Sequence, residues 1–194
     1  MIEPLGIQHV KAVTGLHCQT LTGLLSQLGK PAVEAFYTGC LRSNRAVALV
    51  YLVDAKVRGF VLGSMRPDLL KRDVLRKNVV GTLSSIAIGV ASRPSSLISL
   101  IESFRGNDEK AFDARTPELI YLATAPESRG AGVGNKLVKA FDERMRVAGA
   151  GVYELSVDED NVTAITFYER LGFHFMGHYR EFGIPHRRYR MVIH

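Results

Sequence analysis

The sequence predicts an α/β fold in which strands and helices pack around one core, and three observations point to it. Short β-branched or apolar runs, bounded by turn residues, have the length and composition of strands. Longer segments between them repeat apolar residues every three or four positions, as one face of a helix does. The chain has 194 residues and is 46% hydrophobic, which is enough material for one good core. We therefore expect a single domain over residues 1–194.

The N-terminal part is expected to be helical and then to form a hairpin. Residues 9–41 carry two apolar stripes that are separated by Gly29 and Pro31. The stripes consist of Leu21, Leu24, Leu25 and Leu28, and of Val33, Phe36, Tyr37 and Leu41. Two apolar runs follow, Ala46–Val53 and Val57–Leu62, and the short turn between them predicts a β-hairpin.

Residues from about 66 to 107 predict a helical insertion before the next strand. Leucine and valine at helical spacing indicate one helix near residues 69–75 and a second after Pro94. Strands and helices then alternate. The expected elements are strand 118–124, helix 132–148, strand 152–157, helix 162–171, and strands at about 173–181 and 187–193.

The connection from strand 118–124 to the following helix is rich in glycine. It reads Arg129-Gly130-Ala131-Gly132-Val133-Gly134, and the helix after it has Val133, Leu137, Phe141, Met145 and Ala148 on one face. A glycine-rich turn at a helix N-terminus exposes backbone N–H groups and lets a phosphate approach them closely. Arg129 adds a charged, planar donor. The loop therefore suggests a site for a phosphorylated cofactor, although such a turn is often only a tight connection.

The glycine spacing does not fit the two common nucleotide motifs. A dinucleotide fingerprint needs G-x-G-x-x-G, and a P-loop ends in Gly-Lys-Ser/Thr. Here Gly130, Gly132 and Gly134 alternate, and Asn135 and Lys136 follow them. The pattern Arg129-x-x-Gly132-x-Gly134 instead resembles the coenzyme A pyrophosphate loop of the GNAT superfamily of N-acetyltransferases.

A second segment, Asn161 to Phe173, resembles the other hallmark of that family. In the family an Asn after the fifth strand opens a short helix, and a Tyr near its end lies close to the cofactor sulfur. Asn161 and Tyr168 occupy these positions here. The local chemistry agrees, because Asn is a good N-cap residue and Gly172 fits the left-handed position after the last turn.

The resemblance implies a fold, and this sequence departs from the family pattern at one point. The implied fold is a mixed, mostly antiparallel sheet flanked by helices. Strand 118–124, which would hold the cofactor, and the next strand would be splayed apart at a bulge. The resemblance also implies a third strand between the hairpin and strand 118–124, where this sequence has its helical insertion. We expect that strand to be short, displaced or absent. The insertion is similar to that of bacterial members of unassigned substrate, some of which act on amino sugars or other small amines.

The resemblance further implies acetyl-CoA as the cofactor and assigns its contacts. The pyrophosphate would lie on the loop amides, and the pantetheine arm would pair with the cofactor strand and with Asn161. The implied cofactor-binding residues are Leu122, Ala123, Thr124, Arg129, Gly130, Ala131, Gly132, Val133, Gly134, Asn161, Ala164 and Tyr168. No metal is expected.

The implied reaction is direct attack of a primary amine on the thioester, without an acyl-enzyme. Tyr168 is the candidate donor of a proton to the leaving thiolate, and Glu118 is the best carboxylate on the strand for the role of base. The residues alone leave other interpretations open. Tyr168 fits an ordinary core tyrosine, and Glu118 fits a solvated strand end. The basic run 186–190 is expected to be a solvated or sheet-edge face.

The expected function is therefore transfer of an acetyl group from acetyl-CoA to a primary amine of a small molecule. Two alternatives stay open. One is a modifier of a protein N-terminus, a lysine or an aminoacyl-RNA, and the other is an acyl-CoA-binding protein without turnover. The net charge of +6 favours anionic ligands such as the coenzyme. Because there is no Lys/Arg-rich tail, we do not expect nucleic acid as a partner.

Composition also bounds the location of the protein. Cys18 and Cys40 have no metal or disulfide spacing and fit a reducing cytosol. The N-terminus lacks the basic-then-apolar pattern of a signal peptide. The apolar stretch 86–101 contains Arg93 and Pro94, so no membrane span is expected. We expect a cytoplasmic protein, with a homodimer through C-terminal edge strands as an open possibility.

Overall fold

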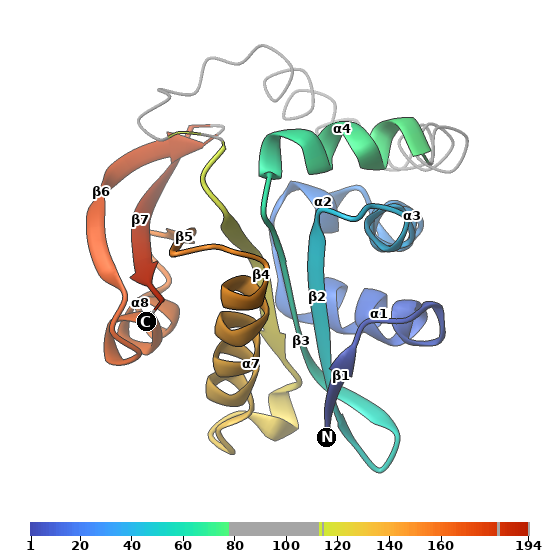
Figure 1. Cartoon of the computed structure of the whole chain (residues 1–194). Coiled ribbons are helices and arrows are strands. Elements are labelled where there is room, and N and C mark those ends of the chain that lie inside the picture. The colour runs from blue at the N-terminus through green and yellow to red at the C-terminus, as the bar shows by residue number, and fades with distance from the viewer. Residues whose placement is uncertain (78–112, 114, 182, 194) are drawn as a thin grey trace.

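The computed structural model describes residues 1–77, 113, 115–181 and 183–193, and its centre is a seven-stranded mixed sheet (Figure 1). The spatial order of the strands is β1-β2-β3-β4-β5-β7-β6, and every neighbouring pair is antiparallel except β4 and β5. The strands are β1 Ile2–Pro4, β2 Ala46–Val53, β3 Lys56–Ser64, β4 Glu118–Thr124, β5 Val152–Asp158, β6 His174–Glu181 and β7 Ile184–Val192.

The predicted hairpin and the predicted strand 118–124 are confirmed, and no third strand is inserted between them in the described part of the sheet, which agrees with the expectation that it is short, displaced or absent. Asp54 and Ala55 form the hairpin turn with φ of 48° and 59°, the left-handed conformation that tight hairpin turns use. β3 pairs directly with β4, so no strand lies between them in the sheet. The additional strand is β1, which pairs with β2 at the N-terminal edge. Three residues carry too little alternation for a strand to be predicted.

The helices lie on both faces of the sheet. They are α1 Val10–Thr20, α2 Leu24–Gln27, α3 Lys30–Leu41, α4 Pro67–Lys77, α7 Val133–Val147 and α8 Val162–Arg170, with short 3₁₀ turns η1 Ile7–His9 and η2 Pro126–Ser128. The expected helical span 9–41 is divided into three, because Leu21 is extended after α1 and Gly29 has φ +86° before α3. α4 confirms the first helix of the insertion, whereas the helix expected after Pro94 lies outside the described residues.

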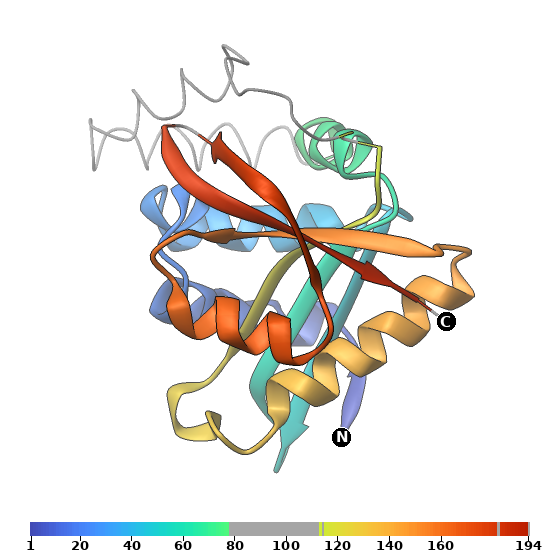
Figure 2. The same ribbon diagram turned by 90° about the vertical axis from the view of Figure 1, so that its left-hand side faces the viewer.

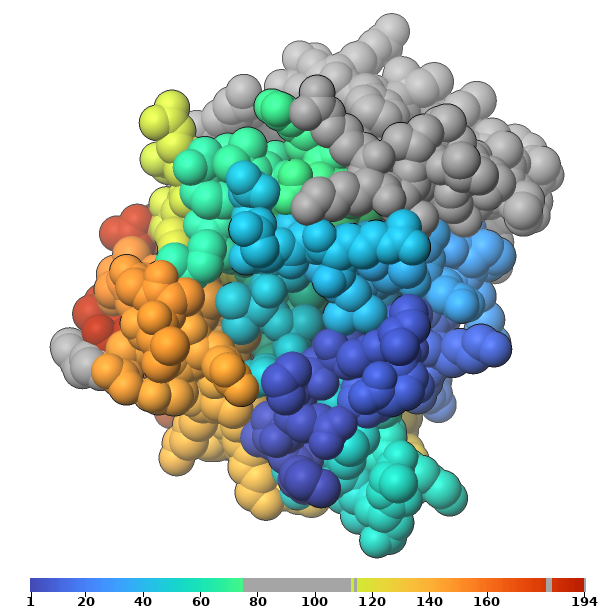
Figure 3. Space-filling view, turned by 45° about the vertical axis from the view of Figure 1, so that its right-hand side comes forward, coloured from blue at the N-terminus to red at the C-terminus, as the bar shows by residue number. Residues whose placement is uncertain are grey.

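Two apolar clusters occupy opposite faces of the sheet. The first joins α1, α3 and α4 to β2–β4, and these helices form a continuous surface in the space-filling view (Figure 3). The second joins α7 and α8 to the other face, where both helices lie on the same side of the sheet (Figure 2). In α7 the buried positions include Val133, Leu137, Phe141 and Met145, as expected. The prediction that Ala148 is a core residue is wrong, because Ala148 is the exposed C-cap of α7 and Ala150 is buried instead.

The basic run 186–190 is not at a sheet edge and is only partly solvated, which corrects the expectation. It lies in β7, which has β5 on one side and β6 on the other. Tyr189 is fully buried, and Arg188 is only 7% exposed. A run that contains arginines resembles a surface strand in sequence, but here Arg188 and Arg190 are paired with Glu154, a buried carboxylate on β5.

β4 and β5 separate almost as soon as they meet. Their register contains one pair, Glu118 with Glu154, and β5 then crosses β4 at a steep angle (Figure 2). The register between β3 and β4 also shifts, since Leu62 pairs with Tyr121 and Gly63 pairs with Leu119. Ile120 is therefore an extra residue in β4, a β-bulge of the kind that increases local twist. The sheet is open along the C-terminal half of β4.

Candidate functional site

The glycine loop leads from the C-terminal end of β4 through η2 into α7. Gly130 and Gly132 have φ of +77° and +73°, the left-handed region that only glycine adopts readily, and Gly132 is the N-cap residue of α7. A Cβ atom added at either position would meet nothing within 4 Å. The glycines are therefore required by the backbone conformation, and the space beside them is open to a ligand.

The N-terminus of α7 presents unsatisfied donors to that space. The first N–H groups of a helix have no intrahelical acceptor, and Gly132 has no side chain that could cap them. α7 has 15 residues, so its dipole adds a partial positive charge at the same point. Arg129 is exposed beside the loop and forms no ion pair within the described ranges. Backbone donors, dipole and guanidinium together fit a pyrophosphate.

The edge of β4 that faces β5 offers backbone groups for an extended ligand. Ala125 donates its N–H to the carbonyl of Arg58 on the β3 side at 2.9 Å. Alternate residues of a strand direct their backbone groups to opposite edges. The N–H and C=O groups of Leu122 and Thr124 therefore point to the β5 side, where the two strands have already separated. Ala123 faces β3 with its backbone, and its buried side chain belongs to the cluster beneath α1 and α3.

The segment after β5 has the local structure that its sequence predicts. Asn161 is the N-cap of α8, and its Oδ1 accepts a hydrogen bond from the N–H of Ala164 at 3.1 Å. Gly172 has φ +87°, and Phe173 donates its N–H to the Tyr168 carbonyl, which closes the C-terminal turn. Asn161 is exposed. Because its carbonyl oxygen is used for capping, its side-chain NH₂ is the group left to bind a ligand.

The ring of Tyr168 packs in the core, while its hydroxyl has no hydrogen-bond partner among the described residues. The residue is 8% exposed, and its ring packs edge to face against Phe167 and Phe173 at centroid distances of 5.1 and 5.2 Å. Burial raises the pKa of the phenol well above its usual value, so the hydroxyl keeps its proton at neutral pH. No residue in the described part of the chain forms a hydrogen bond with that hydroxyl, and it is not among the polar atoms sealed from solvent.

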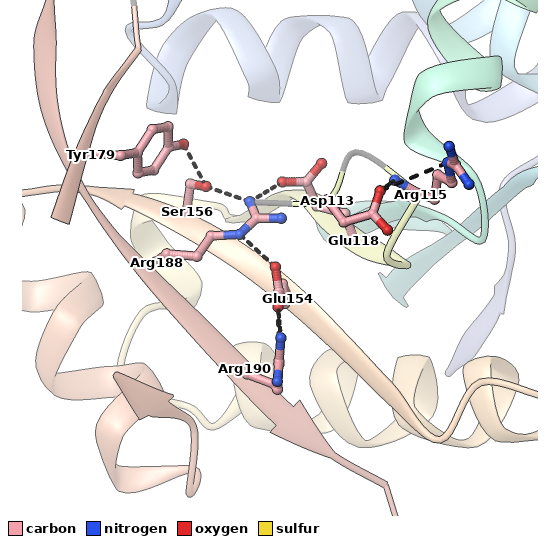
Figure 4. A network of polar contacts seen from close by, with 8 residues as sticks. All are labelled: Asp113, Arg115, Glu118, Glu154, Ser156, Tyr179, Arg188 and Arg190. Atoms are coloured by element: carbon pink, nitrogen blue, oxygen red, sulfur yellow. Dashed lines mark hydrogen bonds and ion pairs between the residues drawn. The ribbon is translucent and has the colours of Figure 1, made fainter. Parts of the chain in front are cut away.

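Glu118 begins β4 at the opposite end from the glycine loop, inside a charged cluster (Figure 4). Its Oε1 accepts a hydrogen bond from Nη1 of Arg188, and its side chain is 22% exposed. Arg188 also donates from Nε to Oε2 of Glu154 at 3.0 Å and from Nη1 to Oγ of Ser156 at 2.6 Å. Glu118 is thus a held carboxylate rather than a freely solvated strand end.

The rest of this cluster was not expected from the sequence. Arg190 donates to Oε1 of Glu154 at 2.9 Å, and the Tyr179 hydroxyl donates to Ser156 at 2.7 Å. Glu154 has only 1% of its side chain exposed. A signal existed in β5, since polar residues alternate there at 154, 156 and 158, whereas Arg187 interrupts the alternation of 186, 188 and 190 in β7. The alternation indicates one polar face on β5, but it does not show which strand pairs with that face.

No described helix has the length and apolar content that a bilayer span requires. Within the described ranges, no group of three or more His, Cys, Asp or Glu side chains could hold a metal ion. The arrangement consists of a glycine loop that could hold an anion at one end of β4, an open strand edge in the middle and a charged cluster at the other end.

Comparison with known proteins identifies a family whose sequence pattern this chain matches. The family model described as "Acetyltransferase (GNAT) family" matches residues 16–173, which is more than half of the chain. Mycothiol acetyltransferase from Corynebacterium jeikeium is 37% identical over 68 residues, but the match covers 34% of this chain and 20% of that protein. The chain therefore spans about a fifth of that curated relative.

Solved structures give the same fold at low identity. The ribosomal-protein-S18-alanine N-acetyltransferase of Escherichia coli has a TM-score of 0.63 and 14% identity, with 100% of this chain and 93% of that chain covered. The yncA protein of Salmonella typhimurium, solved with its cofactor acetyl-CoA, has a TM-score of 0.63 and 15% identity, with coverage of 100% and 94%. These likenesses support the fold and leave the substrate open.

Proposed function

The chain belongs to the GNAT acetyltransferase family. We propose that it is an acyltransferase that uses acetyl-CoA and that its acceptor is a primary amine of a small molecule. The observation that carries the proposal is the position of β4 between the glycine loop and the charged cluster. A thioester held along β4 would have its phosphates at one end and its acyl group toward the other.

We assign cofactor binding to three groups of this chain. The amides of Gly130 to Gly134, assisted by Arg129, would bind the pyrophosphate. The backbone groups of Leu122 and Thr124 would pair with the pantetheine amides, as an added strand pairs with a sheet edge. The NH₂ group of Asn161 would hold the arm from the α8 side. The left-handed φ values of Gly130 and Gly132 and the open space beside them support this fit.

Acetyl-CoA supplies an activated acetyl group as a thioester. The amine nitrogen would attack the carbonyl carbon directly, a C–N bond would form, and the C–S bond would break. The hydroxyl of Tyr168 would give its proton to the departing sulfur, and burial, which raises the pKa of the phenol, keeps that proton on the hydroxyl before the transfer. Glu118 would take the proton that the attacking amine loses. Only Oε1 of Glu118 has a partner within the described residues, which is Arg188.

A protein N-terminus is the second candidate acceptor, because one relative of the same fold is named for ribosomal protein S18 alanine. A polymer acceptor bound through the basic run 186–190 is disfavoured by burial. Arg188 is inside the sheet, and both Arg188 and Arg190 are paired with Glu154. Because Arg188 and Arg190 are already paired with Glu154, a small acceptor is the simpler proposal.

A thiol-release screen tests the proposal. Acetyl-CoA is incubated with the protein and with amino sugars, polyamines, amino acids or N-terminal peptides, and free thiol is measured. We expect release above the hydrolysis background with at least one small amine. Release with peptides alone would replace the acceptor class. Coenzyme A binding in a calorimeter without release from any acceptor class would instead support a binding protein without turnover.

A further inference from the structure

Two carboxylates face each other at the point where β4 and β5 part. Glu118 and Glu154 form the single register pair between these strands, and the N–H of Glu154 donates to the Pro117 carbonyl at 2.9 Å. Like charges directly opposite each other on neighbouring strands are destabilising. Glu154 is 1% exposed, so water screens this repulsion poorly. A cation is needed for the two strands to meet here.

Arg188 supplies that cation from a third strand. It lies opposite Ser156 in the register of β5 and β7, and its guanidinium reaches back toward β4 (Figure 4). Its Nε binds Glu154, while its Nη1 binds both Glu118 and Ser156. The planar fork of an arginine can hold two carboxylates at once, whereas a lysine is a point charge. Burial alone would lower the pKa of Arg188, but Glu118 and Glu154 outweigh it and raise that pKa.

The two carboxylates do not depend equally on Arg188. Glu154 has a second partner, because Arg190 binds its Oε1. Within the described residues Arg188 is the sole cation in contact with Glu118. Removing Arg188 would therefore leave Glu154 paired and Glu118 without its counter-charge, at the apex of the gap between β4 and β5.

We propose that Arg188 is a positioning residue of the acetyl-transfer site, which joins β4 to β5 at the apex of their gap and fixes the Glu118 carboxylate there. The link to turnover rests on the proposed function. The link to the apex rests only on the contacts of Arg188. The two parts are therefore tested by separate measurements.

Thermal melts test whether Arg188 joins β4 to β5 by holding Glu118, and they need no acceptor. The variants are Arg188→Met, Glu118→Gln, the double variant, and Arg190→Met as a matched control on the same strand that does not touch Glu118. We expect Arg188→Met to lower the melting temperature more than Arg190→Met, and the added Glu118→Gln to recover a large part of the loss. Additive losses in the double variant would overturn the proposal. If Arg188→Met does not fold, recovery of a folded protein by the double variant is the same test.

Kinetics test the positioning role with Arg188→Lys, which keeps the charge and loses the fork. With the acceptor found by the screen, or with slow hydrolysis of acetyl-CoA, we expect kcat to fall about tenfold to a hundredfold, the range of misplaced catalytic groups. KM for acetyl-CoA and the coenzyme A Kd should stay within about twofold, because the glycine loop is remote. A wild-type kcat in Arg188→Lys would overturn the positioning role. Wild-type protein without any turnover would reject the proposed function and leave the melting result to decide the apex.

Discussion

The two ends of β4 are built in opposite ways. At its C-terminal end, the glycine loop consists of consecutive residues, offers backbone groups and is exposed. At its N-terminal end, the charged cluster joins side chains from β4, β5, β6 and β7 and is largely buried. The first end is suited to bind a ligand that arrives from water. The second is largely part of the folded core, and Glu118, whose side chain is 22% exposed, is the member through which it would act on a ligand.

This difference predicts that the two ends fail differently when they are changed. Substitutions in the loop or in the Asn161–Phe173 segment should alter binding or turnover in a folded protein. Substitutions in the buried cluster should alter folding first.

Glu154→Leu should have the largest effect, and this effect should be a loss of folding stability. The change leaves Arg188 and Arg190 without their shared carboxylate in a buried site. Breaking a buried ion pair costs about 3–5 kcal/mol. Urea denaturation should show that loss in the free energy of unfolding. The control is Glu143→Gln, which removes an exposed pair with Arg146 on α7 and should leave the midpoint unchanged. A Glu154→Leu midpoint equal to that of the wild type would contradict the structural role of the cluster.

Tyr168→Phe should have the second largest effect, and this effect should be a loss of turnover. The change keeps the ring contacts with Phe167 and Phe173 and removes only the hydroxyl. Loss of a proton donor predicts a decrease in kcat of about 10²–10³. The coenzyme A Kd should hardly change, since the hydroxyl acts mainly in the transition state.

Tyr153→Phe is the matched control for that variant. Tyr153 is buried, contacts Phe173 as well, and donates its hydroxyl to Asp142 at 2.6 Å. Its variant should lose about 1 kcal/mol of stability and keep normal turnover. Full activity in Tyr168→Phe would mean that water or another group protonates the thiolate.

Arg129→Ala should give the smallest of these effects, confined to binding. One well-made charge-assisted contact is worth roughly 1.5–3 kcal/mol, so coenzyme A should bind about tenfold to a hundredfold more weakly. Arg144→Ala, an exposed arginine near the other end of α7, should bind coenzyme A normally. An equal loss for dephosphorylated pantetheine would show that Arg129 does not contact the phosphates.

The same contrast explains what could be predicted from the sequence. The glycine loop, the Asn161 cap and the left-handed Gly172 were predictable, because each depends on the conformations of neighbouring residues. The charged cluster was not, since Glu118 and Arg188 are 70 residues apart in the chain and meet only through the order of the strands. Interpreting residues 186–190 as solvated followed from composition, which does not reveal a buried carboxylate on another strand.

Two smaller errors have local causes. β1 was missed because a three-residue edge strand has no measurable period. Ala148 was expected in the core because helical spacing was extended one residue beyond the last turn. There α7 ends at Val147, and Gly149 with φ +88° turns the chain.

Titration of coenzyme A into Gly132→Val, followed by calorimetry, tests most directly the claim that loop amides bind the pyrophosphate. Gly149→Val is the matched control, because Gly149 is exposed and open like Gly132, has a similar φ of +88°, and lies at the other end of α7. Both variants suffer similar backbone strain, but only a side chain at 132 enters the proposed phosphate site. We predict no measurable binding for Gly132→Val and wild-type affinity for Gly149→Val. A folded Gly132→Val protein that binds coenzyme A as tightly as the wild type would contradict the account.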